Sequence, residues 1–136
     1  MTTWISLYPQ WFISEQKAIA RSYPSFRLDE GLLLKGVLCY YGELVVRPSD
    51  GTKRFPVRLT FPDVTPFGFP VVTPIETIPE FDDEGVVEKH PDAVFFDRRH
   101  QMPGGALCLF QQETRGAEGG ECISAIDVLK RAESWF

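Results

Sequence analysis

Positive charge is scarce in this chain and is nowhere concentrated. Lysine and arginine together number 14 against 19 acidic residues, so the formal net charge is −5 and the pI is about 5. The only short basic cluster is Arg98-Arg99. Proteins that bind nucleic acid directly normally present a basic face to the phosphate backbone. The composition therefore argues against DNA or RNA as a partner.

Cysteine and histidine are also few, with three cysteines and two histidines in 136 residues. Cys39, Cys108 and Cys122 are odd in number, and no two of them have the C-x-x-C spacing. This pattern argues against both a disulfide framework and a zinc site. The sequence also contains no G-x-x-x-x-G-K-[ST] phosphate loop and no G-x-G-x-x-G motif after a strand. We therefore expect neither a metal nor a cofactor.

Long hydrophobic runs are absent as well. No stretch approaches the roughly 18 apolar residues of a membrane-spanning helix. The first residues, MTTWIS, are not a basic segment followed by a long apolar run, which is the pattern of a secretory signal. We expect a cytoplasmic protein without membrane contact, in which thiols stay reduced and available for chemistry.

Two helices are predicted from local signals. Pro9 suits a first helical position and Pro24 lies just beyond the end, which predicts a helix over residues 9–22. Ser124 and Asp127 have the spacing of an N-cap and a first turn, and an apolar stripe follows them. A last helix is therefore expected to begin near residue 124.

The region between these helices has the character of a sheet. Apolar runs and period-2 alternation predict four strands, with Gly42 as the turn between the first two, at residues 32–41, 43–47, 55–61 and 71–75. Short turns between the strands favour an antiparallel meander. The length suits one domain over residues 1–136, and the predicted fold class is α+β.

The most informative stretch for chemistry is residues 97–110, DRRHQMPGGALCLF. Gly104 and Gly105 remove side-chain bulk ahead of Cys108, which allows another polypeptide to approach the sulfur. A thiolate both attacks a carbonyl and leaves from a thioester, so cysteine suits acyl transfer. Taken alone, a cysteine between leucines is more typical of a buried structural thiol.

Several segments together resemble the ubiquitin-conjugating enzyme family. Residues 54–62 (RFPVRLTFP) look like the family's third strand and its terminal Phe-Pro. Residues 66–71 (PFGFPV) are similar to its proline-rich segment, and residues 105–109 (GALCL) to its Gly-x-Ile-Cys-Leu active-site signature. Residues 123–135 resemble the helix after the active site, so the resemblance covers most of the chain from about Pro9.

This resemblance implies a fold of the ubiquitin-conjugating type and a reaction. Cys108 would receive a ubiquitin-like modifier, or another protein C-terminus, as a thioester and pass it to an amine of a target protein. The implied partners are an activating enzyme, which would supply the ATP chemistry, the modifier and the target. A short chain of this kind looks like the bacterial relatives found in ubiquitin-like and antiviral-signalling operons.

One family motif is altered. The family's His-Pro-Asn places its Asn eight residues before the cysteine, where this chain has Arg98-Arg99-His100. By the resemblance, His100 is a second catalytic candidate, as an oxyanion donor or a base; alternatively it only braces the loop. A His-Pro-Asp also occurs at residues 90–92, eighteen residues before Cys108, and is kept as an alternative.

Other interpretations remain open. The chain can be a non-catalytic binding module of the same fold, or a cysteine hydrolase that removes modifiers, which needs a Cys-His pair and an orienting group. Cys39 is expected in the core, and Cys122 at a loop–helix junction. Phe67, Phe69 and Pro70 are expected to pack internally, although in the family this loop also contributes to a partner-binding surface. The acidic residues 76–88 read as a solvated loop or a docking surface for a basic partner.

Overall fold

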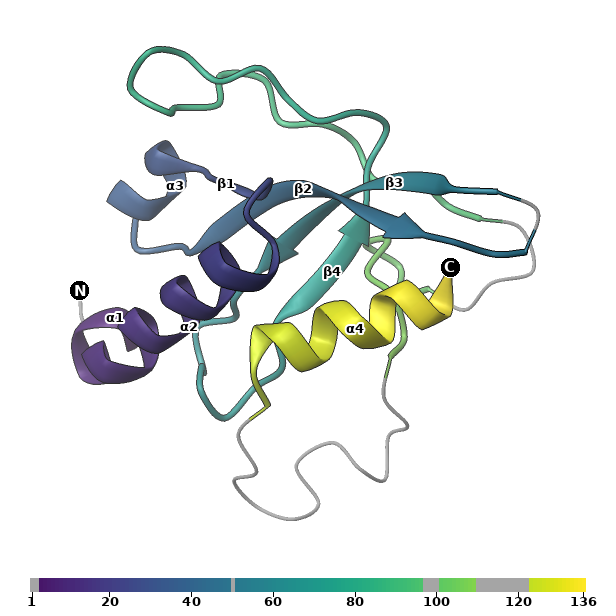
Figure 1. Cartoon of the computed structure of the whole chain (residues 1–136). Coiled ribbons are helices and arrows are strands. Elements are labelled where there is room, and N and C mark those ends of the chain that lie inside the picture. The colour runs from purple at the N-terminus through teal and green to yellow at the C-terminus, as the bar shows by residue number, and fades with distance from the viewer. Residues whose placement is uncertain (1–2, 50, 97–100, 110–122) are drawn as a thin grey trace.

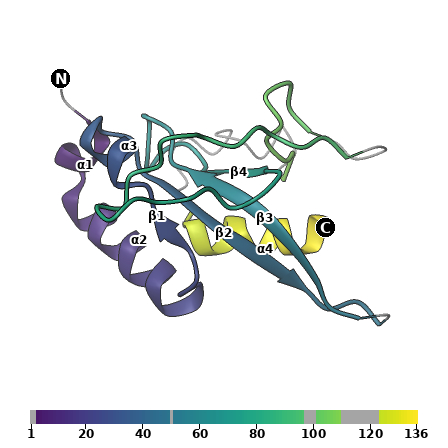
Figure 2. The same cartoon turned by 90° about the horizontal axis from the view of Figure 1, so that it is seen from above.

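The computed structural model describes residues 3–49, 51–96, 101–109 and 123–136. A four-stranded antiparallel sheet lies at its centre, with its strands in the order β1-β2-β3-β4. The two longest helices cover one face of this sheet, and the long segment after its last strand crosses the other (Figures 1 and 2). The strands are β1 (Arg27–Leu28), β2 (Cys39–Val46), β3 (Lys53–Thr60) and β4 (Val71–Pro74). The predicted α+β class with four antiparallel strands is confirmed.

Four helices are present in the described part of the chain: α1 (Trp4–Leu7), α2 (Pro9–Ser22), α3 (Glu30–Leu34) and α4 (Ala125–Trp135). The predicted helix over residues 9–22 is confirmed, with Pro9 at its first position. The final helix is confirmed too, because the Ser124 hydroxyl accepts a hydrogen bond from the Asp127 backbone N–H at 3.3 Å. None of these described helices is long and apolar enough to cross a membrane.

The short helices α1 and α3 were not predicted. Thr3 and Ser6 form a reciprocal capping box at the start of α1, which places the buried Trp4 ring against Phe61 at 5.6 Å between centroids. The expected strand over residues 32–41 is wrong in its first part, since Leu32 to Leu34 belong to α3. The Asp29 carboxylate caps α3 by accepting from the Leu32 N–H at 3.0 Å. Leucine is itself a strong helix former, so the Asp29 cap is enough to start a short helix here.

Gly42 is not a turn, which corrects a second prediction. It lies in the middle of β2, opposite Val57 of β3, and a Cβ at this position would overlap the ring of Phe26. Glycine is therefore required here by close packing rather than by a change of chain direction. The predicted strand over residues 43–47 is the second half of β2. The remaining strand is β1, whose two residues are too few to produce a periodic signal.

Side chains of β2 alternate between two apolar clusters, one on each face of the sheet. Tyr40 and Leu44 belong to the cluster beneath the helices, which also contains Trp4 and most of the buried side chains of α4. Cys39 and Tyr41 face the opposite way, into a smaller cluster with Ile75 and Val87. The expectation that Cys39 lies in the core is confirmed, because none of its surface is exposed.

Candidate functional site

Cys108 lies beside β4, at one end of the described segment 101–109. The Leu107 backbone N–H donates to the Val72 carbonyl at 2.8 Å, which attaches this segment to β4. Leu107 itself is buried, whereas Cys108 is only partly buried. The thiol is therefore carried by a segment anchored on the sheet but is not enclosed in either apolar cluster.

A tight turn precedes the cysteine. Gln101 and Leu107 form an isolated antiparallel bridge, and the Met102 N–H donates to the Ala106 carbonyl at 2.7 Å. The Gly105 N–H donates back to the Met102 carbonyl at 2.8 Å. Gly105 has a φ of 97°, a conformation that residues with a side chain rarely adopt. Of the Gly-Gly pair noted in the sequence, the turn therefore requires the second glycine, Gly105.

The side chain of Gln101 joins this turn to the segment that follows β4. Its carbonyl oxygen accepts from the Phe96 N–H at 2.8 Å. Its amide nitrogen donates to the Val94 carbonyl at 2.9 Å and to the Gly105 carbonyl at 2.8 Å. Gln101 was not predicted from the sequence, because nothing local to a glutamine indicates which distant backbone groups its side chain will meet.

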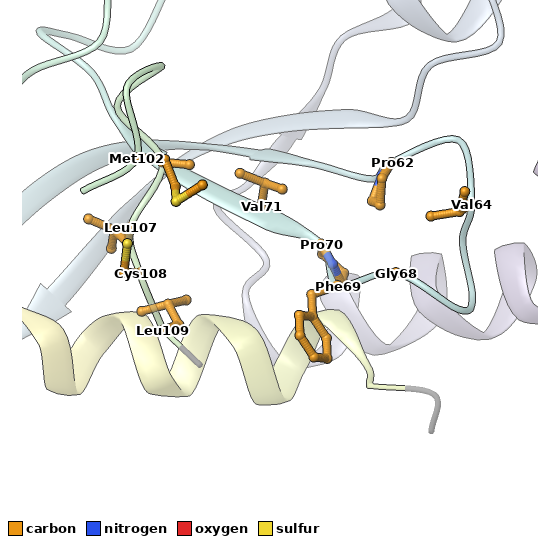
Figure 3. A pocket seen from close by; sticks show the side chains of 11 residues that line it. Pro62, Val64, Gly68, Phe69, Pro70, Val71, Met102, Leu107, Cys108 and Leu109 are labelled. Atoms are coloured by element: carbon orange, nitrogen blue, oxygen red, sulfur yellow. The ribbon is translucent and has the colours of Figure 1, made fainter. Parts of the chain in front are cut away.

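An apolar pocket of about 280 Å³ opens next to Cys108. Figure 3 shows Met102, Leu107, Cys108 and Leu109 on one side of it, Pro62 to Pro70 on the other, and Val71 between them. None of the described residues that line it carries a charge; the eleven are Pro62, Val64, Gly68, Phe69, Pro70, Val71, Met102, Ala106, Leu107, Cys108 and Leu109. The pocket therefore brings the proline-rich segment and the cysteine loop together, which the sequence alone did not show.

His90 lies elsewhere. Its Nε2 is 3.1 Å from Oδ2 of the buried Asp29, and it lines a separate pocket of about 620 Å³ formed by residues 76–92. Asp92 lines the same pocket, while the Pro91 carbonyl accepts from the Arg58 guanidinium at 3.3 Å. The His-Pro-Asp sequence at 90–92 is thus engaged with α3 and β3, and none of its residues lines the Cys108 pocket.

The other candidates divide into two groups. His100, Arg98, Arg99 and Cys122 lie outside the described residues. Cys39 is described, and burial raises the pKa of its thiol to about 11, despite a hydrogen bond from the Thr60 hydroxyl at 3.8 Å. A thiol with this pKa is almost entirely protonated near neutral pH and is a poor nucleophile. In the described ranges, no group of three or more His, Cys, Asp and Glu side chains is arranged to hold a metal ion.

Comparison of this chain with protein-family models, with curated protein sequences and with solved structures found no match.

Proposed function

We propose that this protein is a ubiquitin-conjugating-like acyl carrier that holds the C-terminal carbonyl of a modifier protein as a thioester on Cys108. The observation that carries the proposal is the position of the Cys108 thiol in the wall of an open apolar pocket, outside the core. A structural thiol of the kind seen at Cys39 would be enclosed. A partly exposed thiol beside a pocket has room for an acyl group and for the chain attached to it.

The reaction has two steps. In the first, the Cys108 thiolate attacks the modifier's carbonyl in a thioester on an activating enzyme, a new C–S bond forms, the old C–S bond breaks, and the enzyme's cysteine leaves as a thiolate. In the second, an amine of the target attacks the Cys108 thioester, an amide forms, the Cys108 thiolate leaves, and the amine loses a proton. His100, which lies outside the described residues, is proposed as the oxyanion donor or as the base for the amine.

The order of elements supports a fold of the ubiquitin-conjugating type. Helix α2 precedes the four antiparallel strands, the short helix α3 lies between β1 and β2, and a proline-rich segment leads into β4. A loop with the cysteine and then a further helix come after it. This is the order in which the resembling sequence segments occur in that family. The pocket adds a link between the proline-rich segment and the cysteine that a chance resemblance would not require.

An exposed apolar surface beside the proline-rich segment is proposed to bind a protein partner, as the resemblance implies. Phe67 is 55% exposed and Val64 is 63% exposed, and Phe67 contacts Tyr8 edge-to-face at 5.7 Å. Leu7 is 60% exposed on the neighbouring helix α1. The expectation that Phe67 packs internally is therefore wrong for most of its surface. Exposed apolar side chains gathered in one place are typical of protein interaction sites.

The lining of the Cys108 pocket indicates the chemistry of the carried chain. Because its described lining is uncharged and largely aliphatic, an apolar side chain near the reacting carbonyl is expected to bind better than a charged one. An unpaired charge placed in such a pocket loses its hydration without compensation. We therefore expect a modifier tail with an apolar residue close to its C-terminus.

The test uses fluorescent peptide thioesters that end in glycine, with either leucine or glutamate two residues earlier, and the Cys122→Ser protein. The expected result is a covalent adduct that dithiothreitol removes and that is absent in Cys108→Ala. The leucine donor is expected to react about tenfold faster, corresponding to roughly 1.4 kcal/mol. Mass spectrometry measures adduct formation, and glutathione at equal concentration gives the rate of uncatalysed exchange.

Other outcomes separate the alternatives. An adduct that forms no faster than with glutathione, or that persists in Cys108→Ala, contradicts the proposal and favours a non-catalytic binding module. Rapid release of the free peptide acid, with no adduct at any time, identifies a hydrolase instead.

A further inference from the structure

The strongest unexplained feature near Cys108 is the set of contacts made by one uncharged side chain. The Gln101 amide uses its oxygen and its nitrogen at once, on three backbone groups from two separate segments. All three distances fall between 2.8 and 2.9 Å, and each contact is partly buried. A surface glutamine held only by solvent would not meet three backbone partners in this way.

These contacts connect the turn before Cys108 to β4 by a second route. The Val94 N–H donates to the carbonyl of Pro74 in β4 at 2.9 Å, and the Val94 carbonyl accepts from Gln101. The same Gln101 nitrogen holds the Gly105 carbonyl, three residues before Cys108. The first route is the direct hydrogen bond from Leu107 to Val72. The turn is thus held to β4 at two points: directly through Leu107, and indirectly through Gln101 and Val94.

We propose that Gln101 is the positioning residue of the Cys108 site, and that its amide holds the thiol at the mouth of the apolar pocket. This inference rests on the proposed function, because it assigns a purpose to the position of that thiol. Gln101 does not itself line the pocket, so it acts through the backbone of the turn. Without it, Leu107 alone attaches the turn to β4, and the Cys108 side chain samples several positions.

The chemistry of the amide makes the proposal specific. Two carbonyls and one N–H face the Gln101 side chain, so the site needs a donor and an acceptor together. Leucine has the same approximate shape and offers neither. Ionised glutamate keeps the acceptor for Phe96 but turns oxygens toward the carbonyls of Val94 and Gly105. Protonated glutamic acid regains one donor. In a Gln101→Glu protein the order of the Cys108 side chain is therefore expected to depend on pH, which a packing role of residue 101 would not explain.

The experiment compares Gln101→Leu and Gln101→Glu with the parent protein, all carrying Cys122→Ser. Gln10→Leu, at an exposed position of α2, is the matched control. One readout is the rate of Cys108 adduct formation with the leucine-containing peptide thioester, measured where circular dichroism shows each variant folded. The second is the ¹⁹F spectrum of a trifluoroacetone group attached to Cys108, which reports the order of the side chain without any acyl donor.

Gln101→Leu is expected to slow adduct formation by about tenfold to a hundredfold, because the Cys108 thiol is no longer held in its reactive position. Its ¹⁹F signal is expected to broaden or split, while Gln10→Leu matches the parent in both readouts. Gln101→Glu is expected to resemble Gln101→Leu at about pH 7.5 and to regain a narrow signal near about pH 4.5, where glutamic acid begins to protonate.

An unchanged ¹⁹F signal and unchanged rate in Gln101→Leu overturn the positioning role. So does a Gln101→Glu signal that does not change with pH. If the parent protein forms no adduct, the proposed function fails, and the ¹⁹F spectra still decide whether Gln101 orders the Cys108 side chain.

Discussion

Gly105 lies where the turn before Cys108 packs closely against the segment after β4. A Cβ built at Gly105 would lie 2.6 Å from the Cβ of Ala93, and its φ of 97° is unfavourable for any residue with a side chain. Gly104, its neighbour, has no atom within 4 Å of the same hypothetical Cβ. The two glycines are therefore unequal: the second is required by the backbone, and the first leaves open space before the cysteine.

Gly105→Ala is expected to lower the free energy of unfolding by about 2 kcal/mol, through the left-handed backbone and the contact with Ala93. Gly104→Ala is the matched control and is expected to change it by less than about 0.5 kcal/mol. Urea unfolding followed by circular dichroism measures both. Adding Ala93→Gly is expected to recover only the part due to the contact. Equal effects at the two glycines would contradict this account.

At the scale of elements, α2 and α4 are joined by a buried carboxylate. Glu15 of α2 is 3% exposed, and its Oε2 accepts from the Ala125 N–H at the start of α4 at 2.7 Å. Burial raises the pKa of the Glu15 carboxyl above its ordinary value of 4.5; the hydrogen bond from Ala125 acts in the opposite direction, and Asp127 adds to the rise. The contact ties the start of α4 to α2, through a carboxyl whose pKa is raised by burial.

This pKa direction determines how stability depends on pH. A carboxyl whose pKa is higher in the folded state contributes stability that is fully present below the unfolded pKa and is lost as the pH rises through the folded pKa. Glu15→Gln keeps an oxygen for Ala125 and removes the titration. The stability of the variant relative to the parent is therefore expected to increase as the pH rises from about 4.5 to about 7.5, by roughly 1 kcal/mol.

Urea unfolding at both pH values measures this difference, with Glu43→Gln on the exposed part of β2 as the control for loss of one negative charge. A difference that stays constant or shrinks with rising pH would show that the hydrogen bond to Ala125 outweighs burial.

At the scale of the whole molecule, the sheet holds two apolar clusters that share β2. Trp4 lies in the cluster beneath the helices, with Trp11 and Trp135 packed against it. Cys39 lies in the smaller cluster on the other face, beneath the segment after β4. Tryptophan fluorescence therefore reports on one face of the sheet and Cys39 reactivity on the other. Opening either face exposes the same strand, so the two faces are expected to unfold together.

A variant with Cys108→Ser and Cys122→Ser leaves Cys39 as its single thiol. The urea midpoint of Cys39 reactivity toward a chromogenic disulfide is expected to coincide with that of tryptophan fluorescence. Exposure of Cys39 at lower urea than the fluorescence change would instead show that the smaller cluster opens as a separate unit.

Elements with strong local signals were predictable from sequence. Pro9 and an amphipathic stripe defined α2 and α4, and the alternation of Phe55, Val57 and Leu59 with polar neighbours and Pro56 defined β3. The misassignments occurred where a contact between distant residues decides the structure. Gly42 gives a turn signal in isolation, but it pairs with Val57 inside the sheet, and the ring of Phe26 leaves no room for a side chain there. The two-residue strand β1 exists only because β2 offers it hydrogen-bond partners.

The candidate site shows the same division. The sequence by itself determined that a cysteine follows a permissive Gly-Gly pair and that a proline-rich segment precedes β4, because both depend on local backbone preferences. It also placed Cys39 in the core, but the leucines on both sides of Cys108 left open whether that second thiol is buried or accessible. Only the tertiary structure decided that the Cys108 thiol opens on a pocket. Burial depends on which surfaces meet in space, and the residues next to a cysteine in the sequence do not indicate those contacts.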